Sequence, residues 1–543
     1  MKRRNFIKLS ATASAVGLLP FEMKAVLKQI ALEECDFSNR KLVLIELKGG
    51  NDGLNTIIPI NQYDTYSVLR PNIRVSDTGA NAYITLDSTL PENQQVGLNP
   101  ALTDFKSLYD QGWMKIIQSV GYPSHNKSHF ASRDIISTGN DGNSWLNGTE
   151  SGWIGRFLEL NYQDELATSY PLAVQMGSKS VALDFIGTHE HGMALNITGQ
   201  DLSGFYSVLS GLGGQAPEFI PNSHYGTELD YVIGVDNLSN LYSQSISDAF
   251  NNGSNSVSYP DTDLSDQLKS VAKLISGGLN SKVYLVRIGG FDTHNNQVQD
   301  ANSPLGEHHE LLTTLSEAVK AFLDDLNAQG LADDVVGATY SEFGRKTAEN
   351  GNMGTDHGQV SPMFVFGKPV EAGVTGFNPN LSEASNVNNY QIETLQYDYR
   401  EAFAAIFQDF MAANNDMVNT AFYNHTAASS FTGSKITGLL KDSYIVSENC
   451  YNQALHVDTV EATNFEVYPN PFSSVIHISS NNSLHTFSQY QVMNLGGQLL
   501  SKGSIQIVNN NSLSIPLRNL SSGVYLLRII SDTDTHIFKI MKS

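Results

Sequence analysis

Three apolar runs in the middle of the chain, at residues 41–47, 283–288 and 335–340, predict strands that are buried on both faces. Each run is followed at once by glycine and polar residues. Between the last two runs, the apolar residues of 311–326 recur at three- and four-residue spacing, which predicts an amphipathic helix. Strand, helix and strand in this order form the unit of a parallel sheet. The middle of the chain therefore predicts an α/β fold.

The same pattern predicts further elements around these strands. Residues 115–120 are strand-like and precede a helix that begins near His129, and residues 401–411 form another helix. A helix at 264–275, with Asp263 as its cap, belongs to a helical insertion near 197–280. We expect this insertion to lie over the strand ends and to shape access of a substrate.

The texture of the sequence changes at Asn464, where short β-branched and aromatic runs alternate with turns rich in Asn, Ser and Gly. The predicted strands are 465–468, 475–479, 490–493, 513–516, 524–530 and 536–541. They indicate a small C-terminal β-sandwich over 464–543. We expect a signal peptide at 1–30, the α/β domain at 40–445 and a linker at 446–463.

Composition narrows the classes of function. A formal net charge of −22 argues against a nucleic-acid partner, because phosphate binding needs clustered Lys and Arg. Only Cys35 and Cys450 are present, so a four-thiolate zinc site is excluded, while one long-range disulfide between them stays open. No apolar run downstream of the N-terminus reaches the roughly 18 residues of a spanning helix, so we expect none in the mature chain.

The N-terminus predicts export. Lys2, Arg3, Arg4 and Lys8 precede a short, mildly apolar stretch from Leu9 to Leu19. The run Arg3-Arg4-Asn5-Phe6-Ile7-Lys8 resembles the twin-arginine motif, although Lys2 stands where that motif usually has Ser or Thr. A general secretory signal with incidental arginines is the alternative. The twin-arginine route carries folded cargo, which suits a protein that loads a cofactor before export.

The C-terminus resembles the type IX secretion sorting domain. The resemblance is carried by Val467-Tyr468-Pro469-Asn470-Pro471-Phe472, by Gly523-Val524-Tyr525-Leu526-Leu527-Arg528 and by the terminal Lys539-Ile540-Met541-Lys542. It implies that the export and sorting machinery is a partner and that the protein reaches the cell surface or the extracellular space. A carbohydrate-binding sandwich is the alternative for this segment.

Acidic and histidine residues follow the predicted strands. Asp52 follows the first strand, Asp292 and His294 the second, and Glu342 the third, while a fourth loop adds Asp356 and His357. A lone Asp after a strand is more often a helix cap or a turn former. In open α/β sheets, however, sites form at the carboxyl ends of the strands. Carboxylates and imidazoles without thiolates suit a divalent metal such as zinc, with calcium or manganese as alternatives.

Five motifs together resemble domain-of-unknown-function family 1501 over about residues 40–430. They are Leu47-Lys48-Gly49-Gly50-Asn51-Asp52-Gly53-Leu54-Asn55, Ser128-His129-Phe130, Gly290-Phe291-Asp292-Thr293-His294, Ser341-Glu342-Phe343-Gly344-Arg345 and Gly354-Thr355-Asp356-His357-Gly358. That family is similar in fold to the alkaline phosphatase and sulfatase superfamily. The resemblance implies a doubly wound, mostly parallel sheet that holds one or two metal ions through Asp52, Asp292, His294, Glu342 and His357. Asp356 is either a further ligand or the orienting partner of His357.

The resemblance also implies a nucleophile near 121–130. Ser124 or Ser128 would attack phosphorus or sulfur, with His125 or His129 as general acid or ligand. A structural alternative is that Ser128 only caps the helix that begins near His129. Arg345 would clamp an anionic substrate oxygen, or else pair with a neighbouring carboxylate. The Cys/Ser-x-Pro-x-Arg motif of formylglycine sulfatases is absent.

The leading hypothesis is an exported metal-dependent hydrolase that acts on phosphate or sulfate esters, with a small anionic ester or a surface glycan as substrate. The rival is a non-catalytic cell-surface binding or scaffold protein on the same fold. The hydrolase hypothesis depends on whether the acidic and histidine residues converge on a shared cation.

Overall fold

The computed structural model describes residues 35, 37–143, 151–166, 168–177, 182–187, 191–195, 242–301, 303–422, 431, 435–451, 465–469, 472–480, 487–493, 499–509, 512–517, 520, 523–531 and 535–542. The chain separates into two compact units, within residues 1–452 and 453–543. The predicted signal peptide lies outside the described residues, so the twin-arginine motif stays a prediction.

The first unit is built on a mixed, mostly parallel sheet, as the sequence predicts. Among the described residues it has nine strands in the order β11-β5-β10-β9-β1-β8-β6-β7, with β12 paired to β5. All neighbours are parallel except β10, which runs antiparallel to β5 and β9. The strands are β1 (Lys41–Lys48), β5 (Met114–Gly121), β6 (Ala173–Met176), β7 (Gly192–Leu195), β8 (Val283–Gly289), β9 (Val335–Tyr340), β10 (Ser361–Phe366), β11 (Gly373–Thr375) and β12 (Tyr397–Asp398).

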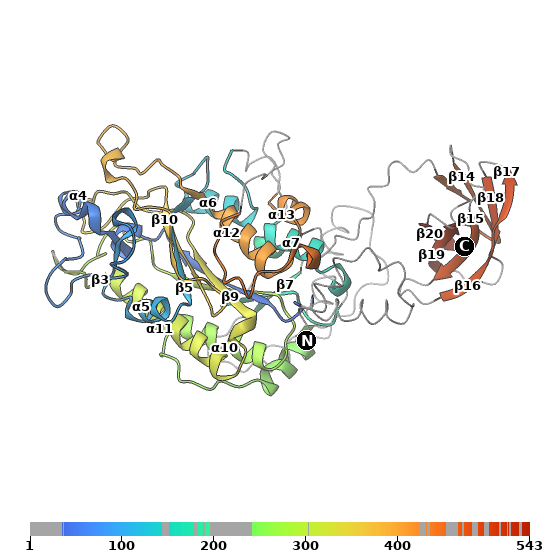
Figure 1. Cartoon of the computed structure of the whole chain (residues 1–543), viewed down its shortest axis with the longest axis horizontal. Coiled ribbons are helices and arrows are strands. Elements are labelled where there is room, and N and C mark those ends of the chain that lie inside the picture. The colour runs from blue at the N-terminus through green and yellow to red at the C-terminus, as the bar shows by residue number, and fades with distance from the viewer. Residues whose placement is uncertain are drawn as a thin grey trace, which may run out of the picture. The chain divides into compact units, whose positions relative to one another are not determined.

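Helices cover both faces of this sheet (Figure 1). One face carries α5 (Thr103–Asp110), α10 (Asp263–Ser276) and α11 (Glu307–Ala328). The other carries α6 (His129–Ser137), α7 (Trp153–Asn161), α12 (Tyr399–Ala405) and α13 (Asn415–Ala421), with a π-helical turn at Ile406–Phe410 after α12. Short elements complete the unit: α3 (Gly53–Thr56), α4 (Tyr63–Leu69), and a small sheet of β2 (Ile57–Pro59), β4 (Val96–Leu98) and β3 (Ile84–Thr85).

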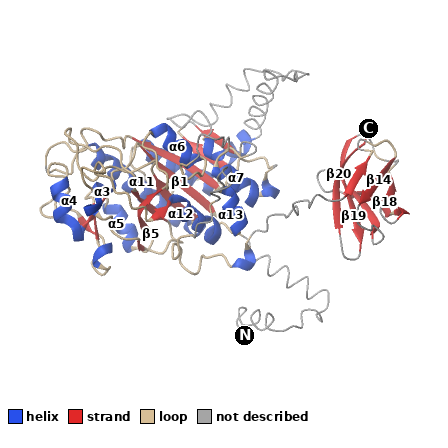
Figure 2. Ribbon diagram, turned by 90° about the horizontal axis from the view of Figure 1, so that it is seen from above, coloured by secondary structure: helices blue, strands red, loops and turns tan. Residues whose placement is uncertain are grey.

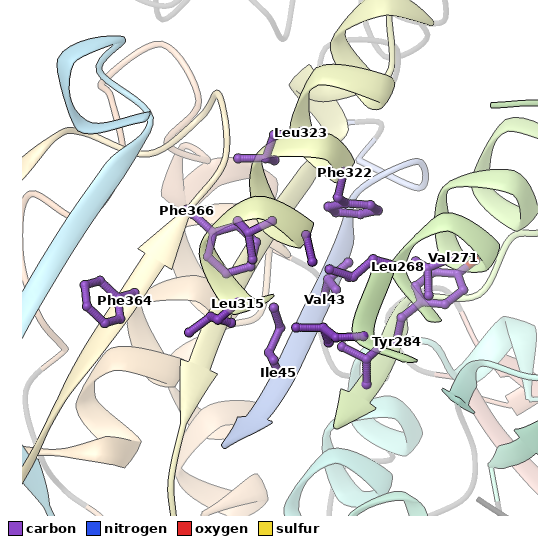
Figure 3. Packing of buried hydrophobic residues seen from close by; sticks show 14 of the residues in the cluster. Val43, Ile45, Leu268, Val271, Tyr284, Leu315, Phe322, Leu323, Phe364 and Phe366 are labelled. Carbon is purple, nitrogen blue, oxygen red and sulfur yellow. The ribbon is translucent and has the colours of Figure 1, made fainter. Parts of the chain in front are cut away.

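The main core lies between the sheet and the helices α5, α10 and α11. Alternate residues of β1, Val43 and Ile45, point into it and meet Leu315 and Phe322 of α11, all with exposed fractions of 0% (Figure 3). Leu268 and Val271 of α10 pack beside them. The other face of β1 is buried too, which explains why its sequence is apolar without alternation.

Two details of the predicted helical insertion differ from expectation. Helix α10 packs against β8 and α11 on the face of the sheet rather than over the strand ends. Its N-terminal cap is Thr262, whose hydroxyl accepts a hydrogen bond from the backbone N–H of Ser265, and Asp263 is the first helical residue. Thr and Asp both cap helices, so the sequence alone does not separate Thr262 from Asp263. In the structure Thr262 has the extended backbone that a cap residue requires. Residues 196–241 of the expected insertion lie outside the described residues.

The second unit confirms the predicted sandwich. Two antiparallel sheets, ordered β13-β14-β18-β17 and β16-β15-β19-β20, enclose one apolar cluster to which Ile476, Leu513, Val492 and Leu527 contribute (Figure 2). The strands are β13 (Phe465–Tyr468), β14 (Val475–Ser480), β15 (Phe487–Met493), β16 (Leu499–Ser504), β17 (Gln506–Asn509), β18 (Ser512–Pro516), β19 (Gly523–Ser531) and β20 (Thr535–Lys542). Strands β16 and β17 are additional to the six that the sequence predicts.

Cys35 and Cys450 form a disulfide whose Cα atoms lie 5.2 Å apart across a sequence separation of 415 residues. The bond therefore ties the beginning of the first unit to its end. Within the described part of the chain, no helix combines the length and the apolar character needed to cross a bilayer.

Candidate metal centre

The topology gathers several loops at one edge of the sheet. β9, β1 and β8 are parallel neighbours, so the residues that follow them, including Glu342 and Asp292, meet at the same edge. Because β10 runs antiparallel to β9, the loop before it brings His357 to this edge as well. β5 is also antiparallel to β10 and ends here, and the loop after it leads to His129 at the start of α6.

Three histidines have a hydrogen-bond acceptor beside Nδ1. His129 Nδ1 lies 2.9 Å from Glu342 Oε1, His294 Nδ1 lies 3.2 Å from Asp356 Oδ1, and His357 Nδ1 lies 2.8 Å from the carbonyl oxygen of Lys127. Carboxylates and carbonyls only accept, so a hydrogen on each Nδ1 satisfies these contacts and leaves a neutral ring with a lone pair at Nε2.

These Nε2 atoms converge on Asp292. The Nε2 atoms of His294 and His357 are 2.9 Å apart, and each lies 3.2 Å from Asp292 Oδ1. His129 Nε2 lies 3.4 Å from Asp292 Oδ2. Around a tetrahedral ion with bonds of about 2.0–2.1 Å, neighbouring ligand atoms stand about 3.3 Å apart. Among the described residues, His129, Asp292 and His357 each offer a ligand atom within 4.8 Å of the others, so these three groups could hold one metal ion. His294 lies beside them through its contacts with His357 and Asp292.

Asp292 is held by Arg345. The guanidinium Nη2 donates to Asp292 Oδ1 at 2.7 Å and also contacts the backbone carbonyls of Gly49 and Phe291. Nε donates to the carbonyl of Gly50, and Nη1 to that of Thr355. The Arg345 side chain is fully buried, whereas that of Asp292 is 46% exposed. Arg345 thus fastens the loops after β1, β8 and β9 to one another and leaves the Asp292 carboxylate facing solvent.

The loop after β1 needs glycine at two consecutive positions. Gly49 has φ +125°, and a Cβ there would lie 2.4 Å from the backbone nitrogen of Asp292. Gly50 has φ +86°, and a Cβ there would lie 2.5 Å from the ring of Phe343. That ring in turn packs against the imidazoles of His129 and His357. The paired glycines therefore let this loop approach both the backbone of Asp292 and the ring of Phe343.

The electrostatics agree with these contacts. The hydrogen bond to Glu342 raises the pKa of His129, whereas burial lowers the pKa of His357. Burial alone would raise the pKa of Glu342, but the hydrogen bonds from His129 and the backbone N–H of Gly49, with the charge of His129, together outweigh it, and the pKa lies below its usual value. The pKa of Asp292 is lowered in the same way, chiefly by its hydrogen bond from Arg345, against the effect of burial. Both carboxyls are therefore ionised at neutral pH.

The structure divides the predicted site residues into groups with different contacts. Asp292, His294 and His357 converge as expected, and His129 joins them. Glu342 and Asp356 contact the histidine rings at Nδ1 instead of facing the shared space. Arg345 pairs with Asp292 and with backbone carbonyls, which is the second of the two roles that the sequence left open, and its side chain is fully buried. Asp52 lies apart from the cluster, with both carboxylate oxygens bound by Arg70.

The two candidate nucleophiles are both exposed. Ser128 occupies the N-cap position of α6, but its side chain makes no capping hydrogen bond, so the capping alternative is not realised. It lies between Lys127, whose carbonyl contacts His357, and His129. Among the contacts of the described residues, Ser124 has only a backbone link, from its N–H to the carbonyl of Asp141.

Sequence reasoning missed three contributors. Gln297 is fully buried and bridges the ligand-bearing loops, because its Oε1 accepts hydrogen bonds from the hydroxyls of Thr293 and Thr355. Arg70 and the carbonyl of Lys127 are the others. None of these residues directly follows a predicted strand. The contact of Lys127 is made by its backbone carbonyl, which every residue type has, so the sequence gives no signal for it.

Two family models match this chain. Residues 278–417 match the family described as protein of unknown function (DUF1501), and residues 466–543 match the secretion system C-terminal sorting domain. The chain is therefore similar to DUF1501 proteins over the first of these segments and to sorting domains over the second. The DUF1501 segment includes Asp292, His294, Arg345 and His357, while His129 lies outside it. The sorting domain marks a secreted, cell-surface or extracellular protein and makes the export machinery a partner.

Two solved structures align with most of the chain at low sequence identity and low TM-score. One is a protein in the alkaline phosphatase superfamily from Vibrio parahaemolyticus, at 9% identity and a TM-score of 0.31, covering 88% of this chain and 82% of that one. Another is the PsFucS1 sulfatase from Pseudoalteromonas sp., at 10% identity and a TM-score of 0.32, covering 94% and 87%. The comparison with curated proteins finds no match.

Proposed function

We propose that this protein is an exported hydrolase of phosphate or sulfate esters, with a metal centre formed by His129, Asp292, His294 and His357. The observation that supports it is the meeting of three imidazole lone pairs and a carboxylate in one accessible place. Such a set of acceptors repels itself unless a cation binds between them. Each histidine also has an acceptor behind its other nitrogen, as metal-ligating histidines almost always do.

The donor set favours zinc, with manganese as the alternative. Imidazole nitrogens and one carboxylate suit these ions, whereas calcium prefers oxygen ligands alone. A divalent ion at this place would polarise an ester oxygen and lower the pKa of a nearby hydroxyl or water. The surrounding residues do the positioning: Glu342, Asp356 and the Lys127 carbonyl hold the rings.

We propose Ser128 as the nucleophile. It is exposed, its hydroxyl is not used for capping, and both of its neighbours in sequence contact the centre. Attack of its oxygen on phosphorus or sulfur would release the alcohol and leave a seryl ester, which water then hydrolyses. The ester class itself follows from the sequence resemblance to the phosphatase and sulfatase superfamily.

The test combines metal analysis with turnover of the purified full-length protein. Chromogenic phosphate monoesters, phosphate diesters and sulfate esters serve as substrates. We expect bound zinc or manganese, turnover of at least one ester class, and loss of both metal and turnover in Asp292→Asn. Ser128→Ala should keep the metal and lose turnover, while the matched variant Ser124→Ala should keep both.

Loss of turnover in Ser124→Ala alone would transfer the nucleophile to that residue. A protein that binds neither zinc nor manganese and hydrolyses none of the esters would overturn the proposal. Retention of such an inert protein on a glycan column would then favour the non-catalytic surface protein.

A further inference from the structure

The carboxylate of Asp52, which follows β1, is already paired with a positively charged side chain. Arg70 contacts Asp52 through two nitrogens, Nη1 to Oδ2 at 2.6 Å and Nη2 to Oδ1 at 2.9 Å. Gln297 Nε2 donates to Oδ2 at 2.5 Å. The exposed fractions of the Arg70 and Asp52 side chains are 0% and 1%. Both oxygens of this carboxylate are thus occupied, away from solvent.

Arg70 is fixed in place by more than Asp52. Its Nε donates to the carbonyl of Thr347 at 2.8 Å, Nη2 to the carbonyl of Lys346 at 2.8 Å, and Nη1 to Asn55 Oδ1 at 2.7 Å. If the guanidinium moved away to admit an ion, these buried acceptors would be left unsatisfied, which is costly in a dry interior. The arginine is therefore a built part of the protein rather than a mobile side chain.

The resemblance drawn from the sequence assigns a metal to Asp52 and allows one or two ions. The residues present do not fit a second ion at this carboxylate, because a bidentate guanidinium fills its coordination positions. Asp292 offers the contrast, since Arg345 contacts only its Oδ1 and the side chain is 46% exposed. Of the two aspartates, only Asp292 is available to a metal.

We propose that the centre holds one divalent ion, and that the Arg70 guanidinium permanently supplies the positive charge at Asp52. This inference rests on the proposed function. Asp52 then acts as a positioning residue. Its partner Gln297 accepts hydrogen bonds from Thr293 Oγ1 at 3.1 Å and Thr355 Oγ1 at 2.9 Å, next to His294 and Asp356. Arg70 meanwhile holds the backbone of Lys346, whose ammonium contacts Asp356.

The first test counts metal ions per full-length chain after dialysis against excess zinc and removal of loosely bound ions. We expect one zinc ion per chain. Two would overturn this inference and leave the proposed function intact, whereas none would overturn the proposed function itself. A crystal structure with anomalous data at the zinc edge locates the ion. The expected peak lies among His129, Asp292, His294 and His357, and a peak at Asp52 would overturn the inference.

The second test removes the buried pair as a unit, in the variant Asp52→Leu/Arg70→Met. Replacement of both charges avoids an unpaired ion in the interior. We expect the count to stay at one, with the affinity for zinc lowered roughly 10- to 100-fold, as for other outer partners of metal ligands. The absorption bands of the cobalt-substituted protein should shift, because the ligand-bearing loops relax. A folded variant that has lost its metal entirely would show that Asp52 is a ligand. Should the variant not fold, the zinc count and the anomalous map still decide.

Discussion

The bond between Glu342 and His129 offers a direct test of how the centre is held. Glu342 Oε1 accepts a hydrogen bond from the backbone N–H of Gly49 at 2.8 Å and from His129 Nδ1 at 2.9 Å. In Glu342→Gln, the amide oxygen can accept both bonds, so the substitution removes the charge and keeps the shape. It therefore isolates what the negative charge contributes to His129 as a ligand.

We expect Glu342→Gln to weaken zinc binding by roughly 10- to 100-fold, the usual cost of losing a carboxylate behind a metal-ligating histidine. That factor corresponds to about 1.4–2.8 kcal/mol. A hydrogen bond to a charged group contributes about 1.5–3 kcal/mol, which is the same range. Glu342→Ala should weaken binding further, because it also leaves the buried N–H of Gly49 without an acceptor.

The assay is competition for zinc between the purified protein and a chromophoric chelator, near neutral pH. The matched control is Glu349→Gln in the same connection between β9 and β10. Its carboxylate accepts hydrogen bonds from Asn72 and Ile73, and it contacts no histidine. Equal zinc affinity of wild type and Glu342→Gln, or an equal loss in the control, would refute the role assigned to the Glu342–His129 contact.

Two further predictions concern the stability of the first unit. Tryptophan fluorescence reports on this unit alone, because all three tryptophans lie before residue 154. Cys35→Ser opens a loop of 415 residues, for which the chain-entropy relation gives about 6 kcal/mol. Because removal of a native disulfide typically costs about 2–5 kcal/mol, we expect a loss of stability in that range in urea, and identical midpoints with and without the bridge would contradict it. Asp52→Asn leaves a buried guanidinium unpaired and should cost about 3–5 kcal/mol at neutral pH. Burial opposes ionisation of Asp52, but the charge and hydrogen bonds of Arg70 outweigh it and lower the pKa of Asp52 below 3.8. The ion pair therefore stabilises the folded state above that pH, and this stabilisation is lost as the pH falls through the folded-state pKa. The gap between wild type and variant should therefore narrow in acid, and a gap that is constant down to low pH would count against the pair.

The sequence predicts the main elements well where the pattern of apolar residues is strong. The strand predicted at 335–340 coincides with β9, and the helix predicted at 311–326 lies within the longer α11. The sequence analysis missed β16 because Ser, Lys and Gly follow its two leucines, and it missed β17 because only Ile507 and Val508 of that strand are apolar. An edge strand needs no continuous apolar pattern when only one of its faces contacts the core.

The candidate site was predicted in outline because the carboxyl ends of parallel strands meet at one edge. That rule places Asp52, Asp292 and Glu342 near one another but says nothing of the direction of each side chain. Direction depends on partners that are distant in sequence: Arg70 for Asp52, Arg345 for Asp292 and His129 for Glu342. No spacing in the chain reveals these pairs, so the division between ligands and their supporting residues needed the structure.

The way each arginine contacts its aspartate explains why Asp292 is available to a metal and Asp52 is not. Arg70 contacts both carboxylate oxygens of Asp52 through two nitrogens, and both side chains are buried. The charge of this carboxylate is therefore already balanced by Arg70. Arg345 approaches Asp292 with one nitrogen, because its other donors are committed to backbone carbonyls. A carboxylate with one oxygen held and the other facing His129 keeps both its charge and its orientation. Such a group is ready to bind a cation without rearrangement, and the two arginines thereby select which acid at the strand ends becomes a ligand.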